Sequence, residues 1–108
     1  MELLICVLND TDSLHDVVAG LMELGIGGGT VIESQGMGKI LSQDIPIFAG
    51  FRHLMSGSRP FNYTILSVVD DKEMADDAVR MVRDILSVTS EKHKGVVFTL
   101  PVSNFEKL

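Results

Sequence analysis

Two strand–helix–strand patterns, separated by a long segment, most constrain what this chain can fold into. The first pattern covers residues 2–34 and the second covers residues 61–102, with residues 37–60 between them. Right-handed crossovers and short connections combine two such units into a single antiparallel sheet with both helices on one face. The sequence therefore predicts one α+β domain over residues 1–108, interrupted by a long excursion at 37–60.

The individual elements follow from hydrophobic periodicity. Strands are expected at 2–8, 30–34, 61–69 and 96–102, which are rich in apolar and β-branched residues. A first helix carries apolar residues at helical spacing and ends at Gly25, while residues 13–16 have the outline of a capping box at its start. A second helix begins near Asp70 and Asp71. This order, βαββαβ, predicts a ferredoxin-like four-stranded antiparallel sheet.

The strands are apolar on both faces of the predicted sheet. Residues 3–8 read LLICVL, and residues 96–98 read VVF. Two helices can cover only one face of a sheet, so the other face needs a cover as well. Because a large exposed apolar patch is rare on a monomer, the simplest cover is another copy of the chain.

Charge and composition exclude several functional classes. The chain has 15 acidic and 9 basic residues, and its Lys and Arg residues are scattered. It therefore lacks the basic patch that a nucleic-acid partner requires. The single Cys6 excludes an internal disulfide. No apolar run reaches the roughly 20 residues that cross a bilayer, so the cytoplasm is the expected location.

The long segment 37–60 combines glycines, apolar residues and positive charge. Gly36 and Gly38 permit close backbone approach to a ligand, and Lys39 supplies a positive charge for an anion. Residues 46–55 have apolar residues at helical spacing, which predicts a short amphipathic helix that packs on its own domain or binds a partner protein. The long loop is therefore the expected functional region.

Motifs for catalysis and for metal binding are not recognisable in the sequence. His15, His53 and His93 have no carboxylate or cysteine at a metal-ligand spacing. No Ser, Cys or His lies in a nucleophile motif. We therefore expect neither catalytic residues nor a bound metal or cofactor.

Four segments resemble the PII nitrogen-regulatory superfamily. They are residues 24–26 (LGI), 30–39 (TVIESQGMGK), 68–71 (VVDD) and 95–102 (GVVFTLPV). The second segment is the most specific, because it is similar to the family run Thr-Val-x-Glu-x-x-Gly-Phe-Gly-Arg, with Met37 for Phe and Lys39 for Arg. The chain is thus identified as a divergent PII-like signalling protein over almost its whole length.

This resemblance implies a homotrimer that binds a small anion or an adenine nucleotide between subunits. The ligand-binding residues that it implies are Thr30, Gly36, Met37, Gly38, Lys39, Lys94 and Gly95. The family pattern Gly-Asp-Gly-Lys is replaced by residues 93–96 (HKGV), and the C-terminal arginines are absent. Residues 98–105 also resemble the tail of the cyclic di-AMP receptor branch, so the ligand stays open. Control by uridylylation is not expected, because Tyr63 belongs to a strand.

The leading hypothesis is a cytoplasmic trimer that regulates a protein partner, a transporter or an enzyme, through the 37–60 loop. The residues assigned to partner binding are Phe48, Phe51, Arg52, Leu54 and Met55. One alternative is a trimeric metal-tolerance protein of CutA-like architecture, which clusters of metal ligands would favour. The other is a small ferredoxin-like enzyme, for which His53 is the loop candidate.

Overall fold

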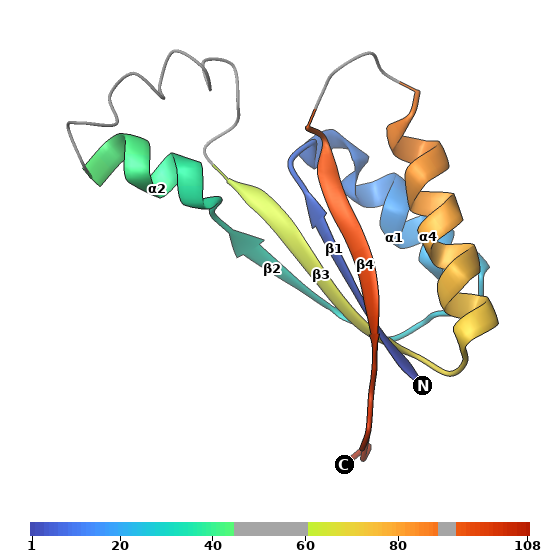
Figure 1. Cartoon of the computed structure of the whole chain (residues 1–108). Helices are drawn as coiled ribbons and strands as arrows, with labels where there is room; N and C mark the ends of the chain where they lie inside the picture. Colours follow the sequence, from blue (N-terminus) through green and yellow to red (C-terminus); the bar gives the residue numbers. More distant parts are fainter. Residues whose placement is uncertain (45–60, 89–92) are drawn as a thin grey trace.

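The computed structural model describes residues 1–44, 61–88 and 93–108. Within them, four strands form one antiparallel sheet in the order β2-β3-β1-β4. The strands are β1 (Glu2–Leu8), β2 (Thr30–Ser34), β3 (Asn62–Val69) and β4 (Gly95–Pro101). Helices α1 (Leu14–Glu23) and α4 (Lys72–Leu86) lie on one face of this sheet (Figure 1). The α+β class and the four-stranded antiparallel sheet are confirmed, and the arrangement is compatible with a ferredoxin-like fold.

Strand β1 lies between β3 and β4 and sets the register of the sheet. Its Leu8 stands opposite Tyr63 of β3 and Gly95 of β4. Alternate side chains of a strand point to opposite faces, and Leu4, Cys6 and Leu8 are fully buried beneath the helices. We call the end of the sheet where β1 and β2 finish and β3 and β4 begin the loop end, and the opposite end the tail end.

Small residues allow the helices to approach the sheet and each other. Ala75 and Ala78 of α4 are fully buried, so this helix packs its backbone close to the strands. A Cβ atom at Gly20 of α1 would press into the side chain of Met81 of α4. A side chain at position 20 would therefore require the side chain of Met81 to move.

Carboxylates of the chain start both helical regions. Asp10 accepts hydrogen bonds from the Asp12 amide at 3.2 Å and the Ser13 hydroxyl at 2.9 Å, at the start of a short 3-10 helix, η1 (Thr11–Ser13), that leads into α1. Ser13 itself makes no capping bond, so the expected capping box is wrong. Asp71 accepts from the Met74 amide at 2.8 Å, which confirms the expected start of α4.

The beginning of the long excursion is helical, which corrects the expectation of a glycine-rich loop from residue 37. Helix α2 (Met37–Asp44) follows β2 and lies on the side of the sheet opposite to α1 and α4 (Figure 1). Gly38 therefore belongs to a helix. The predicted amphipathic helix at 46–55 lies outside the described residues.

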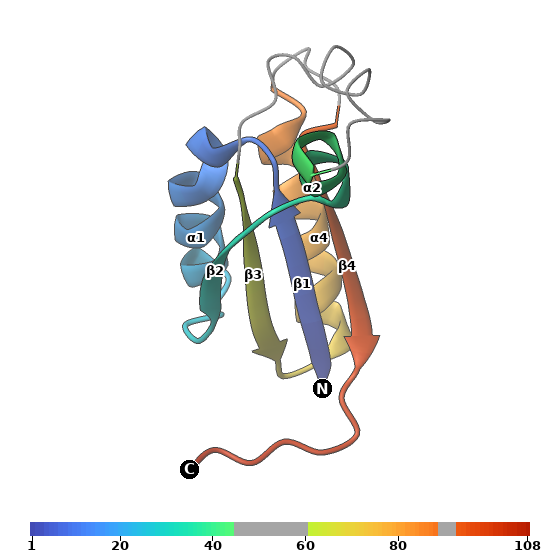
Figure 2. The same ribbon diagram turned by 90° about the vertical axis from the view of Figure 1, so that its left-hand side faces the viewer.

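The face of the sheet away from α1 and α4 is apolar, and we call it the open face (Figure 2). Its centre consists of Leu3, Ile5 and Val7 of β1, which are half-buried by neighbouring side chains. At its margins several large apolar side chains are exposed: Val96 by 58%, Phe98 by 47%, Leu100 by 40% and Ile32 by 43%. In the part of the chain that the structure describes, α1 and α4 cover one face of the sheet, while α2 lies on the side of the other face, where large apolar side chains are exposed.

In the part of the chain that the structure describes, no helix is both long enough and apolar enough to cross a membrane.

We expect the stability of the protein to depend on the protonation of Cys6 above pH 9. Burial raises the pKa of the Cys6 thiol from 9.0 to about 11, so ionisation is harder in the folded than in the unfolded chain. This contribution is fully present below pH 9, and it is lost as the pH rises through 11. Relative to Cys6→Ala, the free energy of unfolding of the wild type should fall by roughly 2 kcal/mol between these values in urea titrations. A parallel pH dependence of the two proteins would contradict this.

Candidate functional site

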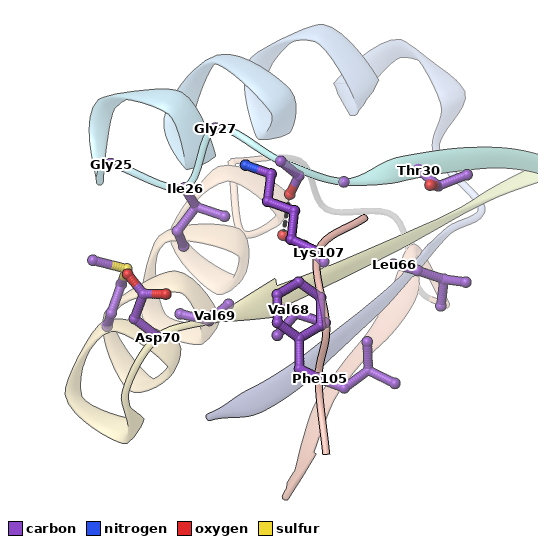
Figure 3. Close-up of a pocket in the computed structure, with 15 residues that line it drawn as sticks. Gly25, Ile26, Gly27, Thr30, Leu66, Val68, Val69, Asp70, Phe105 and Lys107 are labelled. Atoms are coloured by element: carbon purple, nitrogen blue, oxygen red, sulfur yellow. Dashed lines mark hydrogen bonds between the residues drawn. The ribbon is translucent and has the colours of Figure 1, made fainter. Parts of the chain in front are cut away.

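A cavity of about 540 Å³ opens at the tail end of the sheet. Residues 25–30, which join α1 to β2, form one wall, and Leu66 and Val68 of β3 form another. Phe105 and Lys107 of the C-terminal tail extend over β3 toward the first wall (Figure 3). Thr30, a predicted ligand residue, lies in this cavity, which we call the Thr30 pocket.

The glycine-rich wall of the pocket is held by the backbone of α1. The Ile26 amide donates to Leu21 O at 2.9 Å and the Gly25 amide donates to Met22 O at 3.0 Å, with Gly25 at φ 87°. These two bonds and the left-handed glycine make a Schellman motif, the expected ending of this helix. The predicted helix end at Gly25 is therefore confirmed, and the motif turns the chain sharply into the pocket wall.

The same wall is attached to β3 through Ser67. The Ser67 hydroxyl is buried and donates to the Gly28 carbonyl (Figure 3). A Cβ atom at Gly29 would lie 3.1 Å from Leu66 O, so glycine permits this close approach. Gly28, in contrast, has nothing within 4 Å of such an atom. Gly29 is thus required by packing, whereas Gly28 borders open space.

The lining of the Thr30 pocket is apolar with a few polar groups. Asp70 and Lys107 are the charged residues among the described lining, with the hydroxyl groups of Thr30 and Ser67 beside the backbone of the glycines. Apolar walls with a few polar groups are the usual composition of a site for a flat organic ligand. The lining of the Thr30 pocket therefore combines apolar surface with a small number of hydrogen-bonding groups.

At the loop end, the predicted residues Gly36 to Lys39 form the first turn of α2. The amides of Lys39 and Ile40 donate to Gly36 O at 3.1 and 3.3 Å. These two amides are therefore used inside the helix, which differs from the open glycine turn expected from the sequence. Met37 is exposed by 80%.

The other predicted segment, Lys94 and Gly95, makes a tight turn into β4. Lys94 donates through its amino group to Leu86 O at the C-terminal end of α4, where positive charge is favourable. His93 has φ 59°, and Gly95 has φ 157° with no room for a Cβ atom beside the Val7 carbonyl. The shape of this turn thus depends on glycine at position 95.

The structure places the predicted ligand residues in three separate regions of one chain. Thr30 lines the pocket at the tail end, while residues 36–39 and 94–95 follow β2 and precede β4 at the loop end. Strands β2 and β4 are the two edges of the sheet, three strand spacings of about 4.8 Å apart, or roughly 14 Å. The two loop-end segments of a single chain therefore lie at opposite edges of its sheet. The predicted partner-binding residues Phe48, Phe51, Arg52, Leu54 and Met55 lie outside the described residues.

Several residues of these regions were not identified from the sequence. Phe105 was noted only as the end of the segment 98–105 that resembles the cyclic di-AMP receptor tail. Lys107 was not singled out, and Leu66 and Val68 were read as strand interior. Asn9 and Asn62 gave no signal, although they link strands at the loop end. Neither residue belongs to a motif, and their roles depend on the register of strands far apart in the sequence.

Among residues 1–44, 61–88 and 93–108, no three His, Cys, Asp or Glu side chains are grouped to hold a metal ion. Comparisons with models of known protein families and with curated proteins gave no match.

We expect Gly95→Ala to lower the free energy of unfolding by about 2–4 kcal/mol, because the new methyl group overlaps the Val7 carbonyl and the backbone is strained. Gly28→Ala is the matched control, and it should change stability by less than about 0.5 kcal/mol. Urea titration of both variants measures the difference. Equal effects would mean that the turn before β4 tolerates a side chain.

Proposed function

We propose that the protein is a PII-like signalling protein: a homotrimer that binds a small anionic metabolite or a nucleotide at clefts between subunits and regulates a protein partner through residues 37–60. The observation that carries this proposal is the separation of the two predicted basic segments on opposite edges of the sheet. This separation favours a small ligand that takes the two segments from different copies of the chain.

The open face supports assembly of several copies. It exposes large apolar side chains on β4 and β2, while the centre of the face is apolar throughout β1. Burial of apolar surface contributes about 25 cal/mol per Å², so covering this face in an oligomer is strongly favourable. A closed trimer would also bring the β2 edge of one copy toward the β4 edge of another.

The chemistry of the described regions favours a ligand with a ring and an anionic group. The Thr30 pocket offers apolar walls and hydrogen-bonding edges to a ring. Lys39 lies beyond the other end of β2, in the first turn of α2, where a cation and a helix N-terminus favour negative charge. A nucleotide combines these two parts in one molecule.

We expect light scattering to give a mass three times the 11.8 kDa of one chain. Phe98→Glu places a charge on the open face and should yield monomers. The matched control is Met22→Glu on α1, an exposed apolar residue away from this face, which should stay trimeric. A wild-type monomer at micromolar concentration would refute the proposed assembly.

Thermal-shift screening against ATP, ADP, AMP, cyclic mononucleotides and cyclic di-AMP should identify the ligand, since a ligand at 100 times its dissociation constant adds about 2.7 kcal/mol to stability.

Lys39→Ala and Lys94→Ala should each weaken binding of that ligand by about 1–3 kcal/mol in calorimetry. Thr30→Val tests the ring pocket, and Lys72→Ala on the exposed side of α4 is the control. Unchanged affinity in the first three variants would place any ligand elsewhere.

A further inference from the structure

A row of neutral polar side chains crosses the loop end of the sheet on its open face. The hydroxyl groups of Thr64 and Ser34 lie 2.8 Å apart, and Ser34 Oγ donates to Asn62 Oδ1 at 2.5 Å. Asn62 Nδ2 then donates to Asn9 Oδ1 at 3.1 Å. Asn9 Nδ2 donates to the His93 carbonyl at 2.9 Å. The row therefore connects β2, β3 and β1 with the turn before β4.

All hydrogen bonds of this row point in the same direction. Ser34 has one hydroxyl hydrogen, and its nearest acceptor is Asn62 Oδ1 at 2.5 Å, with the Asn62 backbone carbonyl at 3.4 Å. With this hydrogen on Asn62, Thr64 is the donor in the bond between the two hydroxyls. Each amide accepts on one side and donates on the other. Bonds arranged head to tail polarise one another, so loss of one bond weakens the rest.

The end of the row holds an unusual backbone. His93 has φ 59°, a left-handed conformation that is uncommon outside glycine. Asn9 supports this turn in two ways: its side chain binds the His93 carbonyl, and its amide donates to Lys94 O at 2.7 Å. The Asp10 amide donates to the same oxygen at 3.1 Å. Residues 9 and 10 therefore contribute three hydrogen bonds to this turn.

The beginning of the row lies next to the other predicted ligand segment. Ser34 is the last residue of β2, and Gly36 follows two residues later at the start of α2. The row thus joins the start of α2, after one edge strand, to the turn at residues 93–95, before the other edge strand. In the proposed trimer these two segments would belong to different ligand clefts.

We propose that Asn62 and Asn9 are positioning residues that couple the backbone at Ser34 to the turn at residues 93–95 of the same chain. This inference deepens the proposed function, since coupling of these segments would link neighbouring ligand sites. A ligand that orders the start of α2 in one cleft would thereby stabilise the turn at residues 93–95, which would contribute to the neighbouring cleft. The coupling itself exists without a ligand and can be measured in the free protein.

The test measures hydrogen exchange at the amides of Asn9 and Asp10, both of which bind Lys94 O. Ser34→Ala should raise their exchange rates several-fold, although Ser34 is on the opposite edge strand. Ser34→Thr keeps the hydroxyl and should restore wild-type rates. In an Asn62→Leu background, Ser34→Ala should have no further effect on either amide.

A second variant separates coupling from simple loss of stability. Asn62→Asp still accepts from Ser34 but cannot donate, so Asn9 must turn its amide toward the new carboxylate and release the His93 carbonyl. Exchange at Asn9 and Asp10 should then rise several-fold, with exchange at Lys39 and Ile40 of α2 changed less than twofold. Asn104→Asp in the exposed tail controls for the added charge.

Two outcomes would overturn the proposal. One is an unchanged rate at Asn9 and Asp10 in Ser34→Ala, and the other is an equal effect of Ser34→Ala with Asn62 and with Leu at position 62. Should Asn62→Leu not fold, the comparison of Ser34→Ala, Ser34→Thr and Asn62→Asp decides the question alone. Because these measurements contain no ligand, a failed ligand screen would count against the proposed function only.

Discussion

The pairing of β1 with both β3 and β4 is the constraint on which the rest of the structure depends. This register turns Leu4, Cys6 and Leu8 toward the helices, and it turns Leu3, Ile5 and Val7 toward the open face. A slip by one residue would exchange the two sets. Cys6 illustrates the difference between the faces: it is fully buried, and its thiol pKa is raised by loss of water. Within the described residues, both faces of the sheet are therefore apolar, and α1 and α4 cover one of them.

The same register decides where functional segments can meet. Because β1 and β3 occupy the centre, the chain leaves the sheet toward α2 from one edge and enters β4 at the other. Two routes then connect these segments. One route runs within the sheet of a single chain, through the side-chain amides of Asn62 and Asn9. The other would be a contact between the β2 edge of one copy and the β4 edge of a second copy. A trimer would use both, with the covalent chain linking one cleft to the next.

Much of the fold followed from local patterns in the sequence. The bounds of β1 and β2, the end of α1 at Gly25 and the start of α4 at Asp71 depend on periodicity, a left-handed glycine and a capping carboxylate within a few residues. Helix α2 was missed because glycine in a helix is less favourable than alanine by about 1 kcal/mol. Gly36 and Gly38 were therefore taken to indicate a turn, although Gly38 lies in α2. The capping box expected at residues 13–16 is absent, because Ser13 donates its hydroxyl to Asp10 and makes no capping bond of its own.

The candidate site was less predictable, because it depends on contacts between distant segments. Thr30 was identified through a family resemblance, but its pocket also needs Phe105 from the tail, and nothing in the sequence links the two. The row from Ser34 to His93 joins four segments whose only common property is position in the register. Such neutral hydrogen bonds contribute only about 1 kcal/mol each to stability. Their importance therefore lies in the direction and continuity of the row. Through it, a change at Ser34 at the end of β2 would affect the backbone of the turn before β4.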